Sequence, residues 1–266
     1  MAALDAEALR AALVTPHGPY AALDVVSSTG STNADLLAAA GAADRTVLIA
    51  EAQTAGRGRR ARAWVSPPDA GLYLSVLVRP EGVPAVRLGS LSLVAGVALV
   101  RAARHAGVTA TLKWPNDLLA GLAQAKCAGV LAEVGQDGAV VVGIGLNVGP
   151  LPDPVPPGPG GIPATSIAEE GGVGDRAELA VALLRSFDEA ERSWRGAEGD
   201  LSTSGLLAEY RANCSTLGQR VRVELPEDRD FQGTAIDIDA DGRLVVDAAG
   251  AARTVSAGDV VHLRSA

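Results

Sequence analysis

Short apolar runs alternate with polar or glycine-rich segments along the first part of the chain. Runs of this kind, rich in valine, isoleucine and leucine, are typical of buried strands. The pattern therefore predicts strands of one sheet at Val47–Ala50, Leu72–Val78, Thr109–Lys113, Ala128–Val134 and Ala139–Val148.

Longer segments carry apolar residues at helical spacing and begin with residues that cap helices. Ser31 or Thr32 can cap a helix that closes at Gly41, because a hydroxyl accepts from exposed helix amides. The segment Val86–His105 is apolar and small-sided, which suits a buried helix that ends at Gly107. Further helices are predicted at Asp5–Val14, from the capping pair Asp175 and Glu178 to Trp194, and at Gly205–Asn213.

The chain changes character twice toward its carboxy terminus. Residues 149–163 are dominated by proline and glycine and predict a loop. After residue 219 short alternating strands take over, with a hairpin turn at Asp241-Gly242. We therefore expect an α+β protein with a boundary near residues 214–218 and a small barrel-like module after it. The strands of that module are predicted around Val221–Leu225, Leu244–Asp247 and Val260–Leu263.

Charge and composition exclude several classes of protein. The 266 residues have a formal net charge of −8, which argues against a general nucleic-acid binder. Two isolated cysteines, Cys127 and Cys214, fit a reduced cytoplasmic protein and offer no disulfide framework. We expect no membrane span and no secretion signal, because apolar runs are short and the amino terminus lacks a signal pattern.

The excess of acidic over basic residues is reversed in one short segment. Arg57, Arg59, Arg60 and Arg62 follow one another without an acid between them, beside Gly56 and Gly58. Such a loop can close over a phosphate or carboxylate and is expected to be mobile without one. The alternative is a solvated basic loop. A dinucleotide fingerprint at Gly56–Ala61 is rejected, because Trp64-Val65-Ser66-Pro67-Pro68 follows where a helix would have to begin.

Only two of the 23 basic residues are lysines, Lys113 and Lys126, and both lie in chemically dense segments. A site that needs a compact ammonium does not readily accept a guanidinium, so both lysines are candidate site residues. Lys113 can equally form a structural ion pair. A Walker A loop, metal-binding histidine spacing and a serine nucleophile elbow are all absent from the sequence.

Five motifs together resemble biotin protein ligases in order and spacing, and the likeness covers most of the chain. They are Ser31-Thr32-Asn33, Gly56-Arg57-Gly58-Arg59-Arg60, Lys113-Trp114-Pro115-Asn116-Asp117, Lys126-Cys127-Ala128-Gly129-Val130-Leu131 and Gly143-Ile144-Gly145-Leu146-Asn147. The resemblance implies a mixed-sheet catalytic domain of the biotin/lipoate ligase type over residues 1–216. It also implies an SH3-like β-barrel over residues 217–266.

The resemblance further implies a two-step reaction. Biotin and ATP form biotinyl-5′-AMP, with Mg²⁺ as cofactor, and a lysine of a biotin carboxyl carrier domain of an acyl-CoA carboxylase then accepts the biotin. Catalytic roles fall on Lys126, Arg57 and Asp117. Biotin contacts fall on Ser31, Thr32, Asn33, Gln53, Gly56, Arg57, Arg59, Trp64, Lys126 and Gly129. ATP contacts fall on Arg57, Arg59, Arg60, Asn116, Lys126 and Asn147.

Some points stay open from the sequence. Ser31 and Thr32 can cap a helix as well as bind a ligand, and Trp114 is expected to pack in the core. Metal ligands are not identified. Only about 27 residues precede the first motif, so we expect no sequence-specific DNA binding, and a monomer or weak homodimer. A lipoate or octanoate protein transferase and a noncatalytic adaptor are the alternative functions.

Overall fold

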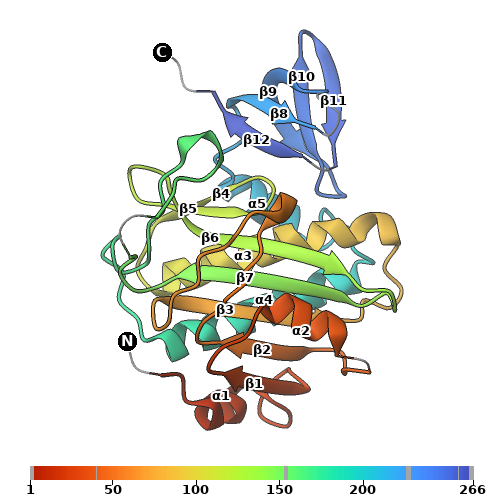
Figure 1. Cartoon of the computed structure of the whole chain (residues 1–266). Coiled ribbons are helices and arrows are strands. Elements are labelled where there is room, and N and C mark those ends of the chain that lie inside the picture. The colour runs from red at the N-terminus through yellow and green to blue at the C-terminus, as the bar shows by residue number, and fades with distance from the viewer. Residues whose placement is uncertain (1–2, 40, 153–154, 226–228, 257, 264–266) are drawn as a thin grey trace.

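The computed structural model describes residues 3–39, 41–152, 155–225, 229–256 and 258–263. Two sheets organise these residues, with helices packed mainly against the larger one (Figure 1). The α+β prediction is confirmed. The helices are α1 (Ala6–Leu13), α2 (Thr32–Ala38), α3 (Leu91–His105), α4 (Arg176–Gly196) and α5 (Leu206–Asn213).

The larger sheet has seven strands in the order β1-β2-β3-β7-β6-β5-β4. The β1–β2 pair is parallel and the other pairs are antiparallel, so the sheet is mixed. Its strands are β1 (Ala22–Val26), β2 (Thr46–Ala50), β3 (Gly71–Val78), β4 (Ala110–Lys113), β5 (Asp117–Ala120), β6 (Ala125–Val134) and β7 (Val140–Asn147). The five strands predicted from apolar runs are all present, whereas β1 and β5 were missed. Both are short and carry an aspartate that weakens the pattern.

The smaller sheet is antiparallel, in the order β11-β10-β9-β8-β12. Its strands are β8 (Arg220–Glu224), β9 (Phe231–Ile238), β10 (Leu244–Ala248), β11 (Ala251–Val255) and β12 (Asp259–His262). The sequence pattern missed β9 and β11. Polar residues interrupt the apolar pattern of β9, and β11 is an edge strand whose first four residues are exposed. The SH3-like assignment and the boundary at residue 216 stay predictions, and residues 226–228, 257 and 264–266 lie outside the described part.

Helices α3 and α4 pack against each other, and α3 also contacts four strands of the larger sheet. The segment predicted as one helix from Val86 divides into a 3₁₀ turn, Ala85–Ser90, followed by α3. By length and composition alone Ala85–His105 could cross a membrane, which the sequence analysis did not anticipate. Most of its apolar window is buried inside the structure, as in a core helix.

The remaining local predictions hold with small shifts. Asp175 caps α4 by accepting from Ala177 N–H, and Ser31 caps α2. Helix α2 ends at Ala38 rather than at Gly41; residue 40 is not described. The proline-rich stretch 149–163 is irregular apart from one 3₁₀ turn, with residues 153 and 154 outside the described part.

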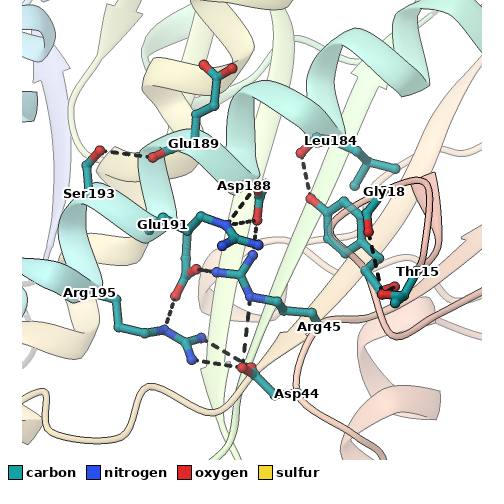
Figure 2. A network of polar contacts seen from close by, with 12 residues as sticks. Thr15, Gly18, Asp44, Arg45, Leu184, Asp188, Glu189, Glu191, Ser193 and Arg195 are labelled. Carbon is teal, nitrogen blue, oxygen red and sulfur yellow. Dashed lines mark hydrogen bonds and ion pairs between the residues drawn. The ribbon is translucent and has the colours of Figure 1, made fainter. Parts of the chain in front are cut away.

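A buried ion network fastens the loop before β2 to α4 (Figure 2). Arg45 contacts both Asp188 and Glu191, and Glu191 also accepts from Arg195 at 2.6 Å. The Arg45 and Glu191 side chains are 14% and 1% exposed, so these charges have little access to water. Removing one partner of such a network leaves the other charges buried and poorly compensated.

We expect Arg45→Met to lower the free energy of unfolding by about 2 kcal/mol, because it removes one of the two cations that contact each of the largely buried carboxylates Glu191 and Asp188. Urea unfolding at neutral pH measures this loss. Arg192→Met is the matched control: Arg192 contacts the same Asp188 but is 60% exposed, so its loss should stay within about 0.5 kcal/mol. Equal losses in the two variants would contradict a buried network.

Candidate active site

A cavity of about 790 Å³ lies on the face of the larger sheet opposite α3 and α4. Predicted site residues from all five motifs line it, although they come from distant parts of the chain. They are Ser31, Thr32, Asn33, Gln53, Arg57, Arg59, Arg60, Trp64, Asn116, Asp117, Lys126, Gly129 and Asn147. Gly56 is the one predicted residue that does not line the cavity. It lies behind the wall, where its carbonyl accepts from Trp64 N–H at 2.9 Å.

Glycines in the middle strands let other groups approach this face of the sheet. A Cβ added at Gly143 would lie 2.1 Å from Asn33 Oδ1, and one at Gly145 would lie 2.5 Å from Trp64 Cε2. The two positions are two residues apart on β7 and therefore face the same side. Gly143 thus receives the start of α2 and Gly145 receives the Trp64 indole. Both glycines belong to one of the five sequence motifs, but the sequence alone did not predict this role.

The polar wall at the start of α2 is held by a continuous set of hydrogen bonds. Gln53 Oε1 accepts from Thr32 N–H at 3.0 Å, and Ser75 Oγ lies 2.7 Å from Thr32 Oγ1. Asn33 accepts from Ser75 at 2.6 Å and donates to Leu131 O and Glu133. Ser31 and Thr32 therefore lie where they can meet a ligand, whereas the Asn33 amide is used within the protein. Ser75 and Glu133 were not predicted as site residues.

Most cations around the cavity already have a carboxylate partner. Lys126 Nζ lies 2.6 Å from Asp117 Oδ1, and Arg57 lies 3.7 Å from Glu133. Arg60 lies 3.3 Å from Asp259, which Arg62 also contacts. The cluster therefore holds itself together electrostatically before any anion arrives, which the sequence could not show.

Two cations that line the cavity have no carboxylate within 4 Å among the residues that the structure describes. Arg59 donates to Gly258 O at 3.0 Å and lies 3.5 Å from Asn116 Oδ1, both uncharged acceptors. Lys113 has no acidic group within 4 Å among the described residues, because Asp117 pairs with Lys126 instead. The structural ion pair considered for Lys113 is therefore not formed. Burial lowers the pKa of both Lys113 and Arg59; the Asp117 carboxylate opposes this effect in part, and neighbouring cations add to it.

The smaller sheet closes one side of the cavity. Gly258 and Asp259 at the start of β12, together with Glu224 of β8, are the groups that contact Arg59, Arg60 and Arg62. Trp114 reaches the same sheet region from the other side: its indole N–H donates to Gly242 O at 2.9 Å, and the side chain is buried. The prediction that Trp114 packs in the core is confirmed.

Asn116 and Asn147 are the other two polar residues predicted for the site, and their side chains donate to backbone carbonyls. Asn116 Nδ2 donates to Val130 O, and Asn147 Nδ2 donates to Thr165 O, each at 2.9 Å. Asn116 Oδ1 already lies 3.5 Å from Arg59, so the Asn147 amide oxygen is the one that remains for a ligand. Among the described residues no group of three His, Cys, Asp or Glu side chains could hold a metal ion.

Comparison with known proteins agrees with this arrangement. Residues 22–149 match the biotin/lipoate A/B protein ligase family, and residues 216–263 match the biotin protein ligase C-terminal domain. A biotin–[acetyl-CoA-carboxylase] ligase of Mycobacterium tuberculosis is 46% identical over 98% of this chain and 96% of its own length. The bifunctional ligase/repressor BirA of Bacillus subtilis is 34% identical over 84% of this chain and 68% of its own length.

A solved structure supports the same assignment. The biotin protein ligase of Aquifex aeolicus, determined in complex with biotin and ATP, superposes with a TM-score of 0.74 and 25% identity. The match covers 92% of this chain and all of that one. Sequence motifs, both family models and the fold thus agree, and the chain belongs to the biotin protein ligase family.

Proposed function

We propose that this chain is an ATP-dependent biotin protein ligase. It converts biotin and ATP to biotinyl-5′-AMP and pyrophosphate, and then transfers the biotin to a lysine of a carboxylase carrier domain. One observation carries the proposal: the same cavity has two different ends. At one end glycines form the floor and Trp64 forms a wall, and the neighbouring end is lined by arginines and two lysines. An apolar ring with a carboxylate tail, joined to a nucleotide phosphate, has the complementary shape and charge.

In the first step a biotin carboxylate oxygen attacks the α-phosphorus, and the bond from that phosphorus to the bridging oxygen of pyrophosphate breaks. Two anions must meet, and at 4 Å in a partly shielded site their repulsion is about 4 kcal/mol. Lys126, Arg57, Arg59 and Arg60 line the place where this happens and offset the repulsion. Mg²⁺ would enter with the triphosphate, since the described residues gather no carboxylate site for it.

In the second step the acceptor amine attacks the acyl carbon of the adenylate, and AMP leaves. The amine must lose a proton, and Asp117 is the carboxylate placed beside Lys126 at this end of the cavity. We assign Asp117 the role of orienting the amine and accepting its proton. Ser31, Thr32 and Gln53 are assigned to the ureido ring, which needs donors and acceptors when buried.

We expect pyrophosphate release that requires biotin and ATP together, followed by streptavidin-detectable labelling of a biotin carboxyl carrier domain. Lipoate or octanoate in place of biotin should release none, since the C-terminal match is to a biotin protein ligase domain. Release driven by lipoate would favour the lipoate alternative, and no release with any acid would favour a noncatalytic adaptor. The synthetic adenylate, added without ATP, tests the second step separately.

The proposal also includes the localisation of the enzyme, its lack of DNA binding and its oligomeric state. The buried free thiols of Cys127 and Cys214 fit a reducing compartment, so we place the enzyme in the cytoplasm. The acidic net charge supports the absence of sequence-specific DNA binding, which a footprint at a defined operator would contradict. A monomer or weak homodimer is expected from sedimentation at micromolar concentration.

A further inference from the structure

A single row of paired residues crosses the floor of the cavity. Gly145 of β7 pairs with Gly129 of β6, Gly129 pairs with Asp117 of β5, and Asp117 pairs with Lys113 of β4. Directly paired residues point to the same face of a sheet, so all four face the cavity. With neighbouring strands about 4.8 Å apart, Lys113 lies roughly 10 Å from Gly129 along this row.

The row runs from an apolar end at Gly145 to a cationic end at Lys113. The Trp64 indole lies over Gly145 and close to Gly129, and Lys126 Nζ lies 5.5 Å from the centre of that indole. Of the two lysines, Lys126, held by Asp117, is therefore the one nearer the apolar end. Lys113 is at the far end of the row, on the edge strand of the sheet. A ligand that starts on the glycines passes Lys126 before it reaches Lys113.

Charge compensation separates the same two lysines. The Lys126 ammonium is paired with Asp117, whereas no carboxylate of the described residues lies within 4 Å of Lys113. The Lys113 side chain is only 5% exposed and lines the cavity. Arg59, also without an acidic partner, lines the same cavity. Asp117 lies opposite Lys113 but pairs with Lys126, so the largely buried Lys113 ammonium is only partly compensated, which favours an anionic ligand there.

We infer that Lys113, assisted by Arg59, binds the β- and γ-phosphates of ATP and holds the pyrophosphate that leaves in the first step. The inference rests on the proposed ligase function and deepens it. As the α-phosphorus bond to the bridging oxygen breaks, that oxygen keeps the electron pair and negative charge grows on the pyrophosphate. An uncompensated ammonium stabilises this charge more than one already neutralised by aspartate. Lys126 then serves the carboxylate and α-phosphate, which stay together in the adenylate.

The two half-reactions separate these roles. Lys113→Met keeps the length of the side chain and removes its charge. In the reverse direction, with synthetic biotinyl-5′-AMP and inorganic pyrophosphate, we expect the KM for pyrophosphate to rise about 10- to 100-fold. Transfer from the same adenylate to a carrier domain, which involves no pyrophosphate, should stay within about twofold of the native rate. Lys113→Arg keeps a cation and should recover most of the pyrophosphate affinity.

Controls distinguish this role from a structural one. Lys113→Met should keep or raise the native melting temperature, because it breaks no described ion pair and removes a costly buried charge. Arg59→Met should share its pyrophosphate defect. Arg104→Met removes one positive charge from the exposed end of α3 and should change neither half-reaction.

An unchanged KM for pyrophosphate in Lys113→Met, or an equal loss in both half-reactions, would overturn the inference. A lower melting temperature without a selective pyrophosphate defect would also overturn it. If the native enzyme uses neither biotin with ATP nor the synthetic adenylate, the proposed function itself fails, which is a separate result.

Discussion

Lys126→Ala is expected to lower kcat/KM for biotin-dependent pyrophosphate release about a thousandfold. The Lys126 ammonium lies 2.6 Å from Asp117 and faces the Trp64 indole, so it lies where carboxylate and α-phosphate meet in the proposed reaction. Its removal takes away one cation and also leaves Asp117 as an unopposed anion in an anion-binding cavity. Stopped-time assays with saturating biotin and varied ATP measure the loss.

A second substitution tests the charge argument. In the double variant Lys126→Ala/Asp117→Asn the stranded carboxylate is neutral, so the KM for ATP should fall about tenfold relative to Lys126→Ala alone. Transfer from synthetic adenylate should remain poor in the double variant, because Asp117 is assigned to the acceptor amine. Lys126→Arg should recover little activity, since a planar guanidinium does not replace a point charge held by one carboxylate.

A control variant shows whether Lys126 takes part in adenylation. Arg185→Ala serves as the control, because Arg185 belongs to α4 on the opposite face of the sheet and donates to Ala12 O. If Lys126→Ala retained the activity of Arg185→Ala, Lys126 would have no part in adenylation. Circular dichroism on each variant confirms that the fold is intact.

Local sequence signals predicted much of this site. Apolar runs located β3, β6 and β7, and the prediction that Ser31 caps a helix at the mouth of the cavity needed only one hydroxyl and its neighbours. The scarcity of lysine directed attention to Lys113 and Lys126 before any geometry was known. The strand and cap predictions are confirmed because each depends on residues close in the chain, and both lysines line the cavity.

Contacts between distant segments could not be predicted in the same way. Asp259 pairs with Arg60 and Arg62 across nearly 200 positions, and Glu133 reaches Arg57 from another strand. Strand register alone does not decide which lysine pairs with Asp117, because Lys113 is directly opposite Asp117 and yet Lys126 forms the ion pair. Only the folded structure therefore shows that Lys113 has no ion-pair partner among the described residues.

The glycines of β7 also contact distant segments that the sequence could not place beside them. Substituting one of them is expected to have a large effect on biotin binding. Gly145→Ala should weaken biotin binding about 100-fold while the free energy of unfolding changes by less than about 1 kcal/mol. A Cβ at this position would lie 2.5 Å from Trp64 Cε2 and Nε1, so the indole must shift, and its place is in the cavity wall. Because the obstructing atoms belong to a side chain on a loop, the fold can absorb the change and the ligand cannot.

Gly143→Ala provides the matched comparison, since the added Cβ would lie 2.1 Å from Asn33 Oδ1. Asn33 is buried and holds α2 to β3 and β6 through Ser75, Leu131 and Glu133. That network cannot move without losing hydrogen bonds, so Gly143→Ala should lower the free energy of unfolding by about 2 kcal/mol. Titration calorimetry with biotin and urea unfolding on both variants separate the effects. If Gly145→Ala bound biotin like the native protein, the Trp64 wall would not belong to the biotin pocket.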